Sequence, residues 1–341
     1  MPGLLLDTLR GNPGSRRPIW LMRQAGRYLP EYRALRAAKG GFLELVHDSG
    51  AAAEITLQPI RRFGLDGAIL FSDILVIPHA LGQELTFAAG EGPQLTPPLV
   101  DAALGSLQPA PERLEPVYRT VKLVREQLGK ETTLLGFAGS PWTVATYMIA
   151  GEGSRDQQAA RLMAYRDPAA LQAILEAIVT LSVEYLSGQI EAGAEAVQLF
   201  DSWAGSLAPR EFERWVIAPN AAIVTGLKRR HPTVPVIGFP KGAGTKLAAY
   251  ACETGIDAIG LDETVDPAWA ARELPAGMPV QGNLDPLLLR AGSDELEMAA
   301  RRILDAFAGR PHVFNLGHGI DKETPISHVE RLLDTVRNWQ G

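Results

Sequence analysis

Two arginines spaced four residues apart, Arg23 and Arg27, are the first residues in this sequence that suggest binding chemistry. On a helical turn their guanidinium groups share one face, where they can bind a carboxylate or phosphate through paired hydrogen bonds. The alternative is a solvated helix face, because Arg33 and Arg36 continue the basic run and Glu31 neutralises part of it. Spacing alone favours this second interpretation, since most surface ion pairs and charge runs contribute little.

A single carboxylate, Asp73, lies between two apolar stretches: Ser72 separates it from Ile69–Phe71, and residues 74–78 follow it. A carboxylate in that setting is expected to be partly buried, and a buried charge needs either a partner or a function. A helix N-cap or an ion pair with a nearby arginine explains Asp73 equally well.

Three further polar residues follow apolar runs: Tyr147, Ser202 and His318. Each has an ordinary structural explanation beside the functional one. Tyr147 can be a core tyrosine, and Ser202 can be a helix N-cap before Trp203. His318 stands between two glycines, which either let a backbone approach a ligand closely or form a solvent-exposed turn.

Short apolar runs predict the elements that position these residues. Each run is rich in branched or aromatic residues and nearly continuous, which is typical of strands buried on both faces. Helical patterns separate most of them, for example at residues 171–190, 248–253 and 293–308. The eight predicted strands are Ile19–Met22, Ala68–Phe71, Thr133–Phe137, Ala196–Phe200, Val234–Phe239, Ala258–Leu261, Val280–Gly282 and His312–Leu316.

Alternation of strands and helices along the whole chain predicts an α/β fold with a parallel sheet. Eight strands favour a distorted (β/α)8 TIM barrel, formed as a single domain over residues 1–341, with extra helices between Met22 and Ala68. No G-x-G-x-x-G motif follows an early strand, which argues against a dinucleotide fold. Because barrel chemistry lies in the loops after the strands, the polar residues named above are expected around one rim.

Composition excludes several classes of function. The net charge of −6 and pI of about 5.6 attract neither nucleic acid nor an anionic membrane. The N-terminus lacks a signal peptide, and the most apolar stretch, residues 67–81, is too short for a membrane span, so we expect a soluble cytoplasmic protein.

The only cysteine, Cys252, is interpreted as a small core residue on a helix. The segment 241–246 resembles a phosphate loop only superficially and is interpreted as a tight barrel loop.

Several long segments resemble the uroporphyrinogen decarboxylase family. The two signature-like segments are residues 18–32 (PIWLMRQAGRYLPEY) and 136–148 (GFAGSPWTVATYM). Shorter matches are FSDIL at 71–75, QLFDS at 198–202, QGNLDP at 281–286 and NLGHGI at 315–320. The resemblance implies a distorted barrel, a homodimer and no metal or organic cofactor. It implies substrate contacts at Arg23, Gln24, Ala25, Gly26, Arg27, Asp73, Tyr147, Ser202 and His318.

The resemblance also implies a reaction. Members of that family convert the four acetate arms of uroporphyrinogen III to methyl groups, giving coproporphyrinogen III and CO2. Asp73 is then expected to accept pyrrole N–H groups, with Arg23 as a second catalytic candidate and the proton donor left open. Two alternatives remain: a methyltransferase that activates a thiol with zinc, disfavoured because Cys252 has no His-x-Cys partner, and a tetrapyrrole carrier without activity.

Overall fold

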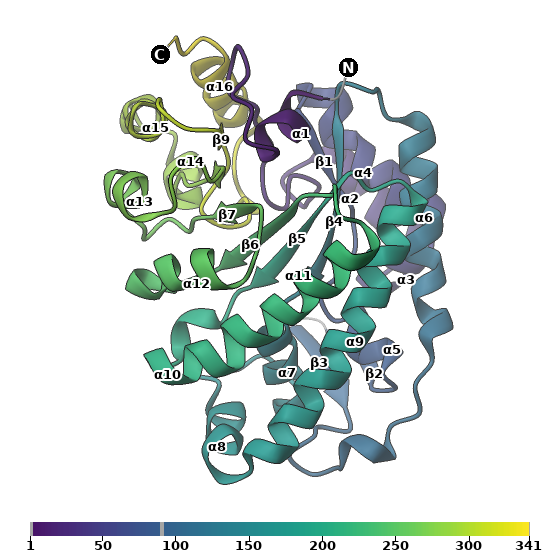
Figure 1. The fold of residues 1–341 in the computed structure, drawn as a ribbon. Helices are drawn as coiled ribbons and strands as arrows, with labels where there is room; N and C mark the ends of the chain where they lie inside the picture. The colour runs from purple at the N-terminus through teal and green to yellow at the C-terminus, as the bar shows by residue number, and fades with distance from the viewer. Residues whose placement is uncertain (1–2, 89–91, 341) are drawn as a thin grey trace.

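The computed structural model describes residues 3–88 and 92–340. Its central element is a curled, seven-stranded parallel sheet in the order β1-β4-β5-β6-β7-β8-β9, surrounded by helices (Figure 1). Almost all residues of these strands are buried, as the continuous apolar runs predicted. The sheet strands are β1 (Gly67–Ile69), β4 (Thr133–Gly139), β5 (Ala196–Asp201), β6 (Val236–Pro240), β7 (Ala258–Gly260), β8 (Val280–Gln281) and β9 (His312–Val313).

Helices connect successive strands and cover the outside of the sheet. Those before β4 are α1 (Leu4–Leu9), α2 (Pro30–Lys39), α3 (Phe42–His47), α4 (Ser49–Phe63), α5 (Val76–Ala80) and α6 (Glu115–Gln127). The later ones are α7 (Pro141–Ala150), α8 (Gln158–Arg166), α9 (Pro168–Ala192), α10 (Pro209–Phe212), α11 (Ala218–Arg230), α12 (Leu247–Glu253), α13 (Pro267–Glu273), α14 (Pro286–Ala291), α15 (Glu295–Ala306) and α16 (Ile326–Arg337). Short helical turns lie at 104–106, 111–114, 204–206, 213–217 and 244–246.

Seven of the eight predicted strands are confirmed, and the first is not. The segment Ile19–Met22 forms no regular strand and makes one parallel bridge, between Ile19 and Phe314. It still lies between the two edges of the sheet: Trp20 N–H donates to the Phe314 carbonyl, and Asp66 N–H donates to the Ile19 carbonyl. Only one residue pairs in register because the chain turns away at Met22 towards the first polar loop.

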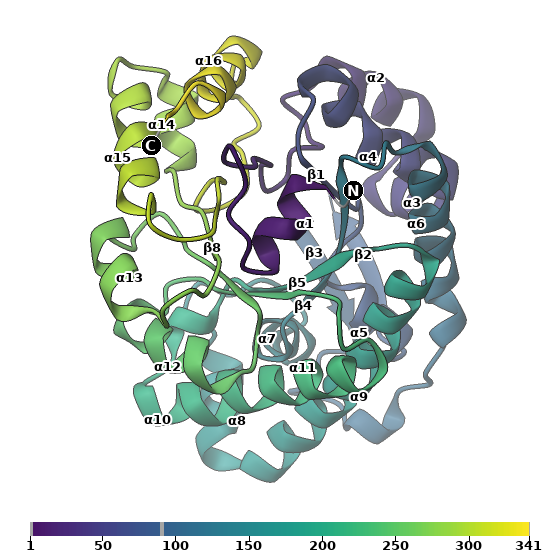
Figure 2. The ribbon, with the colours of Figure 1, turned by 45° about the horizontal axis from the view of Figure 1, so that its top comes forward.

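Two features were not predicted from the sequence. An antiparallel hairpin, β2 (Glu84–Ala88) with β3 (Gly92–Thr96), is inserted after α5. Helix α1 lies in the middle of the ring of helices (Figure 2) and contacts β4 and β9. A Cβ atom added to Gly67, the first residue of β1, would lie 2.8 Å from a Leu5 methyl carbon, so α1 covers the end at which the strands begin.

The predicted helices at 171–190, 248–253 and 293–308 are confirmed as α9, α12 and α15. By length and composition α9 is long and apolar enough to cross a membrane, and residues 67–81 are not the only apolar stretch of this kind. Its buried face packs on α6, α7, α11 and β4, as expected of a core helix. Cys252 lies on α12 as predicted, but it is exposed rather than in the core, because the buried face of α12 carries Leu247, Tyr250 and Ala251.

Candidate active site

Residues 22–29 form irregular turns, so the expectation that Arg23 and Arg27 share a helical face is wrong. Helix α2 begins only at Pro30. Arg23 has a positive φ of 59°, a left-handed conformation that costs an L-residue about 1 kcal/mol and needs support from its surroundings. Gln24 provides that support: its side chain accepts the Leu21 N–H and donates to the Gly67 carbonyl.

Asn315 joins the first polar loop to the last one. Its side-chain oxygen accepts N–H groups from both Met22, at 2.9 Å, and Leu316, at 2.8 Å. The Ile320 N–H donates to the Met22 carbonyl. As a result the Arg23 side chain packs on Gly319, where an added Cβ would lie only 2.4 Å from the Arg23 Cδ atom. The first and last loops of the sheet therefore meet at Arg23.

Asp73 lies in the loop after β1, half-buried. Its Oδ1 atom accepts the Leu75 N–H at 2.8 Å, and Oδ2 has no hydrogen-bond partner in the described part of the chain. Burial raises the pKa of Asp73 above its usual range, while the Leu75 N–H and the positive charge of Arg23 oppose that shift. The alternatives of a helix N-cap and of a closed ion pair do not describe it, so Asp73 can still accept hydrogen bonds from a ligand.

Tyr147 lies on α7, the helix that begins directly after β4. It is only half-buried, unlike a core tyrosine. Burial raises the pKa of its hydroxyl, a hydrogen bond with the Trp203 side chain lowers it, and the charges of Asp73 and Arg23 also act on it. Tyr147, Asp73 and Arg23 are therefore close enough to influence one another.

Ser202 follows β5 and is also half-buried. It is not a helix N-cap, because the short helical turn that follows starts at Ala204 with Trp203 as its N-cap residue.

His318 lies at the end of the last loop, where its ring stacks with that of Phe239 at a centroid distance of 6.5 Å. Burial lowers the pKa of His318 to about 4, and the positive charges of Lys241 and Arg23 contribute, while Asp262 opposes the shift. At neutral pH the imidazole is consequently uncharged in the free protein, and it can bind a carboxylate only by donating a hydrogen bond.

Lys241, Asp262 and Glu263 also belong to this rim and were not among the residues predicted from the sequence. Lys241 follows β6 and forms an ion pair with Glu263 at 3.5 Å. Asp262 follows β7, is buried, and accepts the Gly242 N–H and both donors of Thr264. Lys241 follows one predicted strand, and Asp262 and Glu263 follow another. This position at strand ends could have indicated them from the sequence. The interpretation of 241–246 as a tight barrel loop agrees with its turn structure, but it led us to overlook the charge of Lys241.

The remaining predicted site residues are placed differently. Ala25 and Gly26 are half-buried in the first loop. Gln24 is fully buried and hydrogen-bonded to the backbone, so it shapes the loop and its amide is not available to a ligand. Arg27 is exposed, and its charge does not contribute to the pKa shifts of Asp73, Tyr147 or His318.

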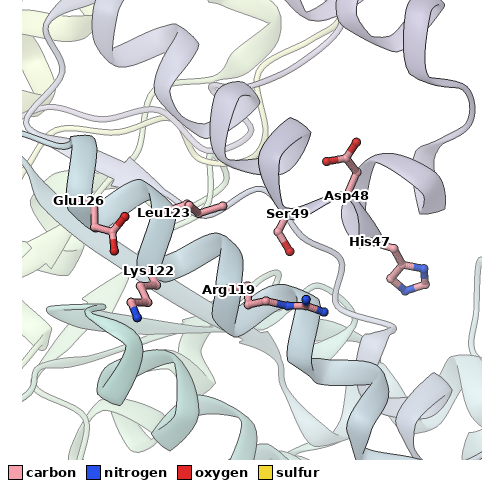
Figure 3. Close-up of a pocket in the computed structure, with 7 residues that line it drawn as sticks. All are labelled: His47, Asp48, Ser49, Arg119, Lys122, Leu123 and Glu126. Carbon is pink, nitrogen blue, oxygen red and sulfur yellow. The ribbon is translucent and has the colours of Figure 1, made fainter.

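A separate hollow of about 540 Å³ lies outside the sheet, between α6 and the turn joining α3 to α4 (Figure 3). Figure 3 shows side chains of both charges spread around it, namely His47, Asp48, Ser49, Arg119, Lys122, Leu123 and Glu126. None of the predicted site residues lines this hollow, and the opposite charges in its lining do not select a polyanion.

Comparison with known proteins decides the family. The profile of the uroporphyrinogen decarboxylase (URO-D) family matches residues 2–339. The chain belongs to the uroporphyrinogen decarboxylase family. It is 73% identical to the uroporphyrinogen decarboxylase of Erythrobacter litoralis, with all of both chains covered. It is 70% identical to that of Novosphingobium aromaticivorans, with 99% of both chains covered.

Solved structures share the fold of this decarboxylase family member at low sequence identity. A methyltransferase from Methanosarcina mazei matches with a TM-score of 0.80 and 20% identity over 98% of both chains. A putative vitamin-B12 independent methionine synthase from Listeria monocytogenes matches with a TM-score of 0.58 and 13% identity, covering 97% of this chain and 98% of its own. Such identities support the fold alone.

Membership in the family decides between the alternatives left by the sequence. The methyltransferase alternative rested on a related barrel, whereas full-length relatives at 70% and 73% identity are uroporphyrinogen decarboxylases. The enzyme is therefore a carboxy-lyase of porphyrin biosynthesis. Among the residues that the structure describes, no three His, Cys, Asp or Glu side chains gather in a metal-binding arrangement.

Proposed function

We propose that the pocket between Arg23, Asp73, Tyr147 and His318 is where this enzyme converts the four acetate arms of uroporphyrinogen III to methyl groups, releasing coproporphyrinogen III and CO2. One observation carries the assignment: Arg23 acts electrostatically on Asp73, Tyr147 and His318, which come from three separate segments, after β1, β4 and β9. A polyanionic ligand needs such a point of positive charge, because the whole chain has a net charge of −6.

We further propose that the fold is one domain over residues 1–341 and a distorted (β/α)8 barrel, in which residues 19–22 occupy the place of the eighth strand. The parallel bridge between Ile19 and Phe314 supports this, as does the hydrogen bond between Asp66 N–H and the Ile19 carbonyl. In a barrel the chemistry lies at the ends of the strands, which is where the pocket residues lie.

In this proposal the arginines position the substrate by its carboxylates. Arg23, with Arg27 and the backbone of residues 24–26, binds substrate arms at the rim, and Ser202 and Tyr147 orient the reacting arm by hydrogen bonds. His318 donates a hydrogen bond to a carboxylate oxygen. Holding the arm in one orientation turns the cleavage into a step within a preassembled complex.

The substrate itself supplies the electron acceptor, so the proposal uses neither metal nor organic cofactor. Protonation of a pyrrole carbon creates a cationic ring, and cleavage of the bond to CO2 sends its electron pair into that ring. The exocyclic carbon then takes up a proton to become methyl, and the ring loses the proton it gained. Ionised Asp73 accepts the pyrrole N–H groups and stabilises the cation, an effect strengthened in a site that excludes water.

The proton donor is not assigned to one residue. An arginine is a poor acid because its pKa exceeds about 12, which weakens the case for Arg23. Burial is the main cause that lowers the pKa of His318 to about 4. Little of the imidazole is therefore protonated in the free enzyme at pH 7. Binding of a polyanion raises the pKa of a nearby imidazole, so both groups stay candidates.

Asp73→Asn tests the proposal, because it keeps the shape of the side chain and removes its charge. We expect CO2 release to fall by about 100-fold or more, with the free energy of unfolding nearly unchanged. Asp334→Asn makes the same substitution at an exposed position on α16 and is the control. Separating the products by carboxyl number measures how far each variant carries the reaction. Unchanged turnover of Asp73→Asn contradicts the role given to Asp73.

We also propose, from the family resemblance, that the enzyme is a cytoplasmic homodimer that binds neither nucleic acid nor membranes. The acidic net charge of −6 supports the last two points. Light scattering of the purified protein measures the oligomeric state, and a mass equal to one chain contradicts the dimer.

A further inference from the structure

Asp201, the last residue of β5, is a fully buried carboxylate that the reaction described above does not use. Its Oδ1 atom accepts the Thr143 hydroxyl at 2.5 Å, and its Oδ2 atom accepts the Asn220 amide at 3.4 Å. No Lys or Arg pairs with it in the described part of the chain. A buried charge without a cation destabilises the fold, so its position one residue before Ser202 suggests a role in the site.

Thr143 connects Asp201 to the backbone of Trp203. Its hydroxyl oxygen donates to Asp201 and accepts the Trp203 N–H at 3.0 Å. The Trp203 carbonyl accepts three hydrogen bonds, from the Trp142 indole at 3.2 Å, the Ser206 hydroxyl at 2.9 Å and the Ser206 N–H at 3.2 Å. The backbone of Trp203 is thus fixed on both sides, which restricts where its indole can lie.

The Trp203 indole in turn reaches the pocket. Its side chain lies close enough to the Tyr147 hydroxyl to lower the pKa of that group, and Tyr147 lies four residues after Thr143 on α7, hence on the same helix face. Both Thr143 and Tyr147 therefore face the turn after β5. Hydrogen bonds thus join Asp201 through Thr143 to the backbone of Trp203, whose side chain lies near the Tyr147 hydroxyl.

We propose that Asp201 is a positioning residue that acts through Thr143 to fix Trp203 and Tyr147 as one wall of the substrate pocket, so that the reacting arm has a single orientation. The inference rests on the proposed function, since it gives Tyr147 a role in binding the arm. A carboxylate is needed because both of its neighbours donate hydrogen bonds. An amide or a protonated carboxyl group has one acceptor atom fewer than a carboxylate. The N–H or O–H group in its place would face the donor of Thr143 or Asn220.

The pair Thr143→Val, which is isosteric with threonine, and Thr143→Ser tests this chain of contacts. Valine keeps the volume and removes the hydroxyl, whereas serine keeps the hydroxyl. We expect kcat of Thr143→Val to fall about 10-fold, with KM changed less than about twofold because the arginines still hold the substrate. Thr143→Ser is expected to retain most of the wild-type kcat. Thr120→Val removes a buried hydroxyl that bonds only within α6 and is the control.

A pH profile adds a readout that a purely structural role does not change. Burial raises the pKa of Asp201 to about 6, although hydrogen bonds from Thr143 and Asn220 oppose the shift, and its negative charge acts on Tyr250. Below that pH the wild-type residue is protonated and resembles asparagine. The ratio of wild-type kcat to Asp201→Asn kcat should therefore be large at pH 8 and approach one at pH 5.

Two results overturn the inference: equal kcat values for Thr143→Val and Thr143→Ser, or a ratio for Asp201→Asn that stays constant with pH. The second measurement remains valid if Thr143→Val fails to fold. Tyr147→Phe separates this inference from the proposed function. If Tyr147→Phe is impaired and Thr143→Val is not, only the positioning role fails; if Tyr147→Phe matches wild type, the proposed pocket fails.

Discussion

Arg23 is placed by its neighbours rather than by a helix. Its backbone is in the left-handed region, Gln24 fixes the loop beneath it, and Gly319 leaves room for its side chain. From this position its charge acts on Asp73 and His318. The absence of a side chain at residue 319 is therefore part of the site geometry.

Gly319→Ala tests the importance of that space. The new methyl group would lie 2.4 Å from Arg23 Cδ, so Arg23 has to move away from the pocket. We expect kcat/KM to fall about 10-fold, because displacing a charged group by about 1 Å weakens its contacts in the transition state. Gly309→Ala is the matched control, since its added Cβ meets no atom within 4 Å. Equal activities of the two variants contradict this account of Arg23.

At the scale of elements, residues 19–22 join the two edges of the sheet through very few backbone hydrogen bonds. Asp66 compensates for this: its carboxylate accepts the Ile19 N–H at 2.8 Å and pairs with Arg16 at 2.5 Å. The Asp66 side chain is only 7% exposed, so these bonds are largely shielded from water. One side chain thereby ties residues 16–19 to the start of β1.

Asp66→Ala should destabilise this junction. It leaves a buried N–H group without its acceptor and Arg16 without its partner, which typically costs about 2–4 kcal/mol. Urea denaturation measures the loss, and hydrogen exchange of the Ile19 amide should accelerate. Glu54→Gln breaks the exposed pair of Glu54 with Arg61 and is expected to cost no more than about 0.5 kcal/mol. A similar cost for both variants contradicts the role given to Asp66.

At the scale of the whole molecule, a chain with a net charge of −6 has to bind a polyanion. The sheet resolves this conflict by collecting cations from distant parts of the chain at one rim. Arg23 comes from the first loop and Lys241 from the loop after β6, and both charges act on His318. At the proposed site we expect attraction at the rim to outweigh the screened repulsion of the rest of the surface.

Substrate binding should accordingly weaken with salt. We expect kcat/KM to fall several-fold between about 50 and 500 mM NaCl, because screening reduces the attraction between exposed charges. Lys241→Gln should raise KM about threefold and make the salt dependence shallower. Lys130→Gln removes the same charge next to the beginning of β4, at the opposite end of the strands, and should change neither. A similar effect of both substitutions would show that only net charge matters.

Residue patterns predicted much of this architecture. The runs that became β1 and β4 to β9 were recognisable because a strand buried on both faces must be apolar throughout. The run at 19–22 is equally apolar but forms a single bridge, since its pairing depends on Phe314, almost 300 residues later. Local composition likewise predicted the α12 helix but not that Cys252 lies on its exposed face.

By itself the sequence determined the types of residue after each strand and, through long motifs, the family. Those properties are local, because a strand end and a motif are each contained in a few consecutive residues. Tertiary structure alone decided that Arg23 lies against Gly319, that Gln24 supports its loop, and that His318 is uncharged at neutral pH. Each of these depends on burial and on charges brought together from opposite ends of the chain.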